Sequence, residues 1–523
     1  MNVKNGILST MLLLSITISL QAQDLGDLDQ NFGSDGFVYT NYETDSAEYL
    51  SDVLVLKSSK ILLGGHILQK GGDDLLVSRL NKNGAIDLNF GVKGYWTYDI
   101  NDKSGDRITA MLELADKKII VVGSTAKNGK TFGFIMRLNA NGSLDMSYGE
   151  GSKGYTLFNA GSHKSCRPAD VEIYQNSIYI AATVWTDDNN YDMGIFKFSA
   201  SGALVNSFAS SGSNVVHLKG SEEVSSLDIG SDGSFIIGGT STKSGDQYGA
   251  ILKLNQFGLK TSAFDGAGYL VYNHGGDVNT IMDVAYDSKG RIVAIGSEGT
   301  NPDINGIIFR FDKNGLPDDE FGTNGKIQSD IGSANGVYLN SLNVDENDHI
   351  LCSGYLFGQS YRDIYVLKLT DQGKAHPDFG TKGDVNYPLD LTPNYLHFKA
   401  TSMQSNGSII LAGTTTISGY DAFNITVGRI HHWQDAATAN TLSLNINTFQ
   451  VWPNPAKDIV HIQTNGKVLK SIQLVDLQGR IIQNWNADSG EQSFPLSAEI
   501  QGGSYLIRFI LDNALYTQRI VIQ

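Results

Sequence analysis

One pattern recurs along the sequence at a nearly constant interval, and this repeat restricts the possible fold more than any other feature. Each copy holds a triplet of the type Asn-Phe-Gly, and in several copies an Asn-Gly pair precedes it. The aromatic residue of the triplet recurs at spacings of 56 to 60 residues: Phe32, Phe90, Tyr148, Phe208, Phe264, Phe321 and Phe379. A fixed period of this size is typical of proteins built from stacked repeats.

Each period predicts four extended segments and no helix. Glycine is abundant (58 residues) and proline scarce (9), and the apolar segments are rich in Val, Ile, Tyr and Phe, which favours short strands joined by tight turns. We name the expected strands A to D in chain order, with D directly after the triplet. Strand C ends in a basic residue in all seven copies: Arg79, Arg137, Lys197, Lys253, Arg310, Lys368 and Arg429.

Four-stranded units with this period indicate the blades of a β-propeller. A D strand at residues 37–40 precedes every A strand, and the last A, B and C strands (396–430) have no D strand after them. We therefore expect the N-terminal strand to pair with the last three and to close a seven-bladed ring, which removes two open sheet edges. The predicted fold is all-β, with this propeller at residues 24–433.

The loop between strands C and D carries an aspartate in four copies. We expect it either to cap a turn or to pair with the cation of strand C, and we favour this structural role over catalysis because a catalytic site is not usually repeated in every copy. The segments GALVNSFASSG and GLKTSAFDGAG, in copies four and five, lack the aspartate. The four positions are Asp29, Asp87, Asp145 and Asp318.

The repeated pattern xxNGxLDxxFGxxG, with Arg-Leu just upstream, resembles the delta-60 repeat, a bacterial β-propeller-type repeat. The resemblance covers Asp24 to about Ile430. It implies a fold, and it implies no defined chemistry.

The first 22 residues have the composition of a secretory signal peptide. Lys4 is followed by the apolar run Ile7–Leu20 and by the small residue Ala22. We expect cleavage near Ala22–Gln23, since the run is short for a membrane anchor, which is the alternative. No later segment is apolar enough to span a membrane.

The C-terminal residues 447–523 follow a small, polar linker at 434–446 and predict a β-sandwich from their alternating apolar pattern. Three motifs resemble the type IX secretion C-terminal sorting domain, although Trp452 stands where Tyr is common. The resemblance implies recognition by the type IX machinery and export through the outer membrane of a gram-negative bacterium, usually with removal of the domain. An adhesive accessory domain is the alternative. The motif residues are Pro453, Asn454, Pro455, Asp476, Gly479, Arg480, Gly503 and Tyr505.

Neither the net charge of the chain nor the spacing of its acidic residues favours binding of nucleic acid or of a cofactor. The net charge of −16 argues against nucleic acid, which requires clustered cations. Asp188, Asn190 and Asp192 alternate as calcium ligands do, but the glycine is displaced and Ser199 stands where a glutamate is needed. We therefore expect a turn and no cofactor, with Ca²⁺ as the alternative.

Exposed aromatic residues in the B–C connections are the expected ligand-binding groups, because rings with a polar tip suit sugars and peptides. We expect an exported, non-enzymatic propeller that binds a glycan or a protein. The alternatives are an extracellular enzyme acting on polysaccharide at the mouth of the channel and a structural surface component, and no catalytic residue stands out. The aromatic residues are Trp185, Tyr191, Tyr248, Tyr355, Phe357, Tyr361 and Tyr420.

Overall fold

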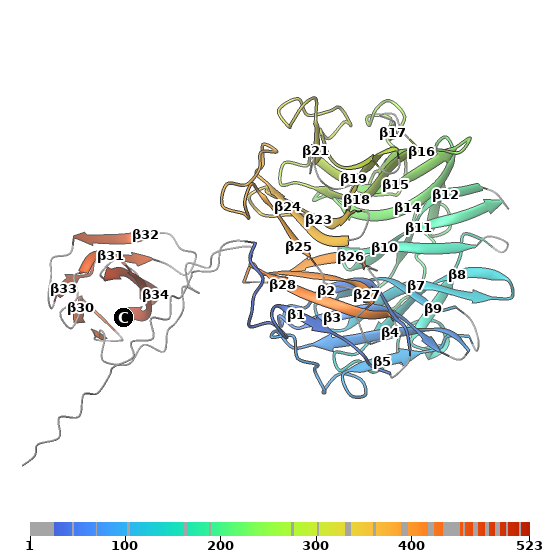
Figure 1. Ribbon diagram of the computed structural model, residues 1–523. Coiled ribbons are helices and arrows are strands. Elements are labelled where there is room, and N and C mark those ends of the chain that lie inside the picture. The colour runs from blue at the N-terminus through green and yellow to red at the C-terminus, as the bar shows by residue number, and fades with distance from the viewer. Residues whose placement is uncertain are drawn as a thin grey trace, which may run out of the picture. The chain divides into compact units, whose positions relative to one another are not determined.

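The computed structural model divides into two compact units, one covering Asp24–Trp433 and the other including Gln434–Gln523 (Figure 1). The predicted signal peptide (1–22) and linker (434–446) lie outside the described residues. No helix in the described part of the chain is long and apolar enough to cross a membrane. The described residues are 26–43, 46–69, 71–101, 105–161, 165–187, 190–272, 277–300, 303–329, 336–358, 362–388, 396–404, 406–416, 423–431, 450–452, 456–463, 469–475, 481–486, 492–497, 500, 502–511 and 514–522.

The larger unit is a β-propeller. Its described strands fall into seven antiparallel sets of four, which we number as blades 1 to 7. The first three blades are β2 (Glu48–Val55), β3 (Ile61–Gln69), β4 (Gly72–Leu80) and β5 (Tyr95–Tyr98); β6 (Arg107–Glu113), β7 (Ile119–Lys127), β8 (Lys130–Leu138) and β9 (Tyr155–Phe158); and β10 (Cys166–Tyr174), β11 (Ser177–Asp187), β12 (Asn190–Phe198) and β13 (Ser213–Val216). A single 3₁₀ turn, η1 (Glu150–Ser152), precedes β9.

The remaining blades follow the same order of strands A to D. Blades 5 and 6 are also joined by one parallel bridge between Ile304 and Gly336. Blades 4 to 7 are β14 (Ser221–Ile229), β15 (Phe235–Lys243), β16 (Asp246–Leu254) and β17 (Tyr269–Tyr272); β18 (Val278–Tyr286), β19 (Ile292–Thr300), β20 (Asp303–Phe311) and β21 (Lys326–Ser329); β22 (Gly336–Val344), β23 (Ile350–Phe357), β24 (Arg362–Leu369) and β25 (Asp384–Pro388); and β26 (Leu396–Met403), β27 (Ile409–Thr416) and β28 (Phe423–Ile430) with β1 (Phe37–Tyr39).

The N-terminal strand closes the ring, as the sequence predicts. Strand β1 pairs antiparallel with β28, with Phe37 opposite Gly428 and Tyr39 opposite Thr426. The first and last parts of the propeller therefore share one sheet, and in Figure 1 the blue β1 lies beside the orange β28. No sheet edge is left open at this junction.

The triplet aromatics pack between neighbouring blades. Phe90 is fully buried and shares one apolar cluster with Val77 of blade 1 and with Ile108 of blade 2. The Asn-Gly turn of the next blade lies on the same ring: a Cβ at Gly142, where φ is +86°, would come within 2.9 Å of it. The repeated sequence therefore encodes one interface, in which an aromatic ring of one blade meets a glycine turn of the next.

An arginine at the end of strand C connects the parts of this interface in four blades. Its guanidinium lies 4.4–4.7 Å from the centroid of the triplet ring, and its Nη1 donates a hydrogen bond to a backbone carbonyl of the next blade's turn. We call this set of contacts the arginine bridge. Its Nε donates to the aspartate of the same blade: Arg79 to Asp87 at 2.7 Å, Arg137 to Asp145 at 2.8 Å, Arg310 to Asp318 at 2.8 Å, and Arg429 to Asp29 at 2.9 Å.

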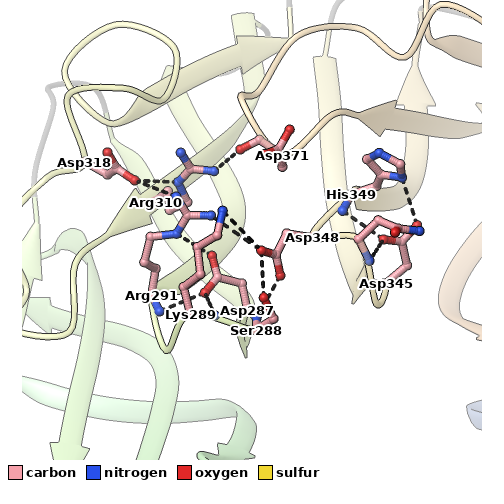
Figure 2. A network of polar contacts seen from close by, with 11 residues as sticks. Asp287, Ser288, Lys289, Arg291, Arg310, Asp318, Asp345, Asp348, His349 and Asp371 are labelled. Carbon is pink, nitrogen blue, oxygen red and sulfur yellow. Dashed lines mark hydrogen bonds and ion pairs between the residues drawn. The ribbon is translucent and has the colours of Figure 1, made fainter.

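Figure 2 shows the bridge of blade 5, where Arg310 lies between Asp318 of its own blade and the Asp371 carbonyl of blade 6. A second cation, Arg291, lies 3.4 Å from the Asp318 carboxylate. The pair is nearly inaccessible to water, since the side chain of Arg310 is 2% exposed and that of Asp318 14%.

The C-terminal unit contains two sheets around one core. One sheet consists of β29, β30 and β33, and the other of β32, β31, β34 and β35. Val460 and Ile462 of the first sheet share a buried cluster with Leu474 and Ile507 of the second, so the two sheets pack face to face. The strands are β29 (Gln450–Trp452), β30 (Ile459–Gln463), β31 (Leu469–Val475), β32 (Ile481–Asn486), β33 (Gln492–Pro495), β34 (Gly503–Leu511) and β35 (Ala514–Ile522).

The arginine bridge predicts that substitution of Asp318 lowers the stability of the protein strongly and that substitution of its neighbour Asp319 does not. Asp318→Asn leaves the Arg310 guanidinium buried without its carboxylate, and we expect the free energy of unfolding to fall by about 3 kcal/mol. Asp319→Asn, at the exposed next position, is the matched control and should change it by less than about 0.5 kcal/mol. Urea unfolding of both variants measures the difference, and equal stabilities would contradict a structural role for the bridge.

Candidate functional site

The A strands of all seven blades line a central channel with a volume of about 700 Å³. Each A strand has a bulge at the same place, where one residue has no partner on strand B. The residue after the bulge lines the channel in every blade: Asp52, Ala110, Asp170, Ser226, Asp283, Ser341 and Ala400. Aspartate therefore alternates with a small residue around the first six blades.

Each channel aspartate also joins its blade to the next. Asp52 accepts a hydrogen bond from the backbone N–H of Met111 at 2.8 Å, and Asp170 accepts one from Leu227 at 2.8 Å. Asp283 accepts one from Leu342 at 2.7 Å. The small residues between them keep the carboxylates from being direct neighbours around the ring.

The channel raises the pKa of its carboxyl groups. Burial raises the pKa of Asp52 and of Asp283 to about 7 and that of Asp170 to about 6, and nearby carboxylates contribute to all three shifts. Burial, followed by the charges of Asp170 and Asp228, raises the pKa of Glu172 to about 8. Hydrogen bonds from backbone N–H groups act in the opposite direction on each of these groups. Near neutral pH the channel therefore holds carboxyl groups that retain protons.

Glu172 and Asp228 are the two channel carboxyls that follow the bulge positions by two residues. Asp228 accepts the Tyr286 N–H of the next blade at 2.6 Å, whereas Glu172 accepts a bond from its own strand, at Ile173. A carboxyl group with a pKa near 8 has the protonation state that a general acid needs. The arrangement can thus donate protons or hold a cation, and sequence reasoning missed it because no pattern marks the bulge.

The structure places five of the seven aromatic residues that were expected to bind a ligand, and it corrects their setting. They lie on paired strands and not in loops: Trp185 on β11, Tyr191 on β12, Tyr248 on β16, and Tyr355 and Phe357 on β23. Strands B and C remain hydrogen-bonded up to tight turns, as in the pair Lys243 and Asp246. Tyr361 and Tyr420 lie outside the described residues.

Half-buried aromatic groups form clusters at the end of the blades where the B–C hairpins lie. The Trp185 and Tyr191 rings meet edge to face at 4.9 Å, and the Arg167 guanidinium lies 5.8 Å from the Trp185 ring. Tyr355 stacks on Tyr338 at 5.0 Å, and Arg362 lies 5.2 Å from the Phe357 ring. We call these the Trp185 cluster and the Tyr355 cluster.

A third group of rings at this end of the propeller was not expected from the sequence. Tyr49 stacks on His66 at 4.8 Å and lies 5.2 Å from Phe423. Tyr49 and Tyr338 both stand two residues before the bulge of their A strands. Only two of the seven A strands carry tyrosine at this position, so the sequence repeat did not mark it.

The structure gives Asp192 different partners from those expected of a calcium loop. Asp188 lies outside the described residues, and the Asn190 amide donates to the Thr186 hydroxyl at 3.2 Å. Asp192 lies with His217 and Glu222, so that one ligand atom of each lies within 4.8 Å of the others. Both Glu222 oxygens already accept backbone N–H groups of residues 218–220. The cluster has ligand types suited to a divalent cation, and Ca²⁺ stays the alternative to the expected turn.

Of the sorting-motif residues, two lie in the described part of the chain. Gly503 begins β34, and Tyr505 on this strand packs against the core of the C-terminal unit. Their place in a paired strand gives them a structural part in that unit. The other motif residues lie outside the described residues: Pro453, Asn454, Pro455, Asp476, Gly479 and Arg480.

Two family models match segments of the chain, one in the C-terminal unit and one in the first two blades of the propeller. The family described as "Secretion system C-terminal sorting domain" matches residues 450–523, and the family described as "Domain of unknown function (DUF5122) beta-propeller" matches residues 58–90 and 114–148. The chain therefore combines a β-propeller with a type IX sorting domain, which indicates export to the cell surface or the extracellular space. Comparison with curated protein sequences finds no match.

Several solved structures resemble the chain at the level of the fold. The polysaccharide lyase Uly1 matches with a TM-score of 0.43 and 11% identity over 79% of this chain and 98% of its own. An ulvan lyase of family PL25 has a TM-score of 0.43 and 12% identity over 76% and 96%. Sqt1 from Chaetomium thermophilum has a TM-score of 0.38 and 11% identity over 92% and 99%. These low values say nothing about function.

The channel carboxyls predict a loss of stability as the pH rises. A carboxyl group with a raised folded-state pKa stabilises the fold fully below its unfolded pKa, and this contribution is lost as the pH rises through the folded value. For Asp52 and Asp283 that window runs from about pH 4 to about pH 7. We expect the midpoint of thermal unfolding to fall over this range, and Asp52→Asn with Asp283→Asn to flatten the fall because an amide oxygen still accepts the N–H. A pH series that is unchanged in the double variant would contradict the raised pKa values.

The bridge aspartates predict that stability changes with pH in the opposite direction at lower pH, where it falls as the pH falls. Burial opposes the charge of Asp145, but hydrogen bonds from Lys118, Ser147 and Arg137 outweigh it and hold the pKa of Asp145 well below its ordinary value. Its contribution to stability is present above pH 4 and is lost as the pH falls below that value. The same pH series, extended to pH 2, should therefore show a second loss that Asp52→Asn and Asp283→Asn leave unchanged.

The sorting domain predicts a defect in export when it is removed. A chain ending at residue 446 lacks the segment that matches the sorting family and should stay inside the cell envelope of its bacterium. Immunoblots of medium, cell surface and cell interior measure its distribution. The full chain carrying Trp185→Ala is the control and should be exported normally. Equal amounts of the truncated and full chains outside the cell would contradict the prediction.

Proposed function

We propose that this protein is an exported, non-enzymatic β-propeller that binds a glycan or a protein ligand at the end of the blades where the B–C hairpins lie. The observation that carries the proposal is the set of half-buried aromatic clusters at that end, with Trp185 and Tyr355 as central rings. Each ring keeps part of its surface accessible while a neighbour supports the rest. Such rings provide stacking surfaces for sugars or for peptide side chains.

The position of these rings on strands supports binding. A ring on a paired strand loses little conformational freedom when a ligand binds, because the sheet already holds its backbone. Arg167 and Arg362 place a cation beside the Trp185 and Tyr355 clusters, which adds hydrogen-bond donors for hydroxyl or carboxylate groups. The clusters come from blades 3 and 6, so an extended ligand of several units fits this arrangement better than a small molecule.

The hydrogen bonds of the channel aspartates favour binding over catalysis. Asp52, Asp170 and Asp283 each accept a backbone N–H of the next blade, which gives them a structural role. A catalytic carboxyl needs an oxygen directed at the reacting atoms.

An enzyme that acts on polysaccharide is the second candidate, and the raised pKa of Glu172 is the observation in its favour. A protonated carboxyl beside the ionisable Asp228 is the kind of pair that hydrolyses a glycosidic bond. The two candidates place their key residues on different surfaces. Substitutions therefore distinguish them.

A glycan array followed by a pull-down with polysaccharides tests the proposal on the full chain. We expect binding without breakdown of the polysaccharide, and a loss of affinity of about tenfold or more in Trp185→Ala and in Tyr355→Ala. Phe257→Ala removes a ring that is 62% exposed in a turn at the opposite end of blade 4, and it should bind as the wild type does.

Two outcomes would overturn the proposed function. Breakdown of a polysaccharide that Glu172→Gln abolishes would assign the protein to the enzymes. Binding that persists in both Trp185→Ala and Tyr355→Ala would remove the clusters from the ligand site. Addition and chelation of Ca²⁺ during the screen tests whether the Asp192 cluster contributes.

A further inference from the structure

Blades with lysine at the end of strand C also lack the bridge aspartate. In the four arginine blades an aspartate faces the guanidinium, and it stands eight residues further along in three of them. In the three lysine blades the position eight residues after the cation is occupied by Val205, Thr261 and His376. The cation and its carboxylate have thus changed together, three times within one chain.

The surroundings of the strand C lysine differ among the three lysine blades. Lys197 of blade 3 is half-buried and lies 5.2 Å from the Tyr179 ring and 5.7 Å from the Phe208 ring. Lys368 of blade 6 is fully buried. Lys253 of blade 4 is half-buried and borders a cavity of about 650 Å³ between blades 4 and 5. We call this cavity the Lys253 pocket.

Lys253 has an incomplete set of partners. Its ammonium group donates to the Lys313 carbonyl at 2.8 Å and lies 5.6 Å from each of the Phe264 and Tyr286 rings. It forms no ion pair with a carboxylate in the described part of the chain. An ammonium group carries three donors, so two of them are directed to the pocket or to water.

The three carboxylates that line the Lys253 pocket are held by other groups. Asp287 accepts Arg291 Nε at 2.5 Å, and this pair is visible in Figure 2. Asp232 accepts the Ser234 N–H at 2.9 Å, and Asp228 accepts the Tyr286 N–H at 2.6 Å. Among the described residues Lys253 thus has no carboxylate within ion-pair distance, and the charges of Asp232 and Asp312 act on it only from farther away.

The rest of the lining suits a sugar ring. Tyr286 offers a half-buried ring, and Asn255 and Asn314 offer amide groups, whereas Phe264 lies buried behind them. Aromatic faces with a few polar groups are the usual lining of a carbohydrate site. The volume is large enough for one monosaccharide and some water.

We propose that the Lys253 pocket binds a uronic acid, whose carboxylate pairs with Lys253 in the place that the bridge aspartate occupies in blades 1, 2, 5 and 7. The site lies at the end of the blades where strand C terminates, opposite to the aromatic clusters. It therefore goes beyond the proposed function and does not depend on it.

Isothermal titration calorimetry of the full chain with D-glucuronate and with D-glucose tests this site. D-glucuronate should bind at least about tenfold more tightly than D-glucose, since only the acid supplies a charge for Lys253. Lys253→Met should weaken D-glucuronate binding by a similar factor. Absence of D-glucuronate binding, or equal affinity for the two sugars, would overturn the proposal.

A rebuilt bridge gives the sharper test. Lys253→Arg with Thr261→Asp supplies the carboxylate from the chain itself, so D-glucuronate binding should disappear while the midpoint of thermal unfolding stays equal or rises. The same pair of changes in blade 3, Lys197→Arg with Val205→Asp, is the matched control and should leave binding unchanged. Full binding by the rebuilt blade 4 variant would overturn the proposal, and Trp185→Ala, which tests the proposed function, should not affect it.

Discussion

The fold depends on a single inter-blade contact in which a guanidinium joins three groups that lie far apart in the sequence. The arginine lies over the aromatic ring of its own blade, pairs with the aspartate of its own loop, and donates to a carbonyl of the next blade. Burying an ion pair is costly unless hydrogen bonds satisfy both partners, and the bridge satisfies both. Its last copy joins Arg429 of blade 7 to Asp29 near the start of the propeller and to the Lys82 carbonyl of blade 1. The contact that repeats along the chain is thus also the one that helps to close the ring.

The centre of the ring poses the opposite electrostatic problem. Seven A strands meet around one channel, and every group at the position after the bulge lies near its equivalents from the other blades. The chain places aspartate at three of these positions and alanine or serine at the other four. Raised pKa values then allow the carboxyls to keep protons, which reduces their mutual repulsion near neutral pH. The hydrogen bonds that Asp52, Asp170 and Asp283 accept from backbone N–H groups of the next blade resemble the arginine bridge in their role.

Features that repeat in every copy could be predicted from the sequence, and features that occur in a few copies could not. The strand order and the closure by β1 follow from a period of nearly constant length. For the aspartate that recurs in four copies, the sequence left a turn cap and a pair with the strand C cation as alternatives, and the structure shows the pair with the arginine. The channel carboxyls escaped prediction because only Asp52, Asp170 and Asp283 share the position after the bulge, and a bulge depends on pairing across strands. The aromatic residues were assigned to loops because polar residues surround Trp185 and Tyr191 in the sequence. Pairing with the opposite strand instead keeps them within the sheet.

Departures from the repeat are where this architecture gains room for a ligand. A contact that is complete in both partners leaves no charge for another molecule, so Arg79 and Arg310 have nothing to offer a ligand. Loss of the aspartate alone would leave a buried guanidinium without a partner, which is strongly destabilising. Replacement of arginine by lysine shortens the reach of the cation and lets aromatic rings or water cover part of it, as Lys197 illustrates. At Lys253 the interface borders a pocket, so the position of a site in such a ring follows from which copy has relaxed the shared contact and how its neighbours fill the space.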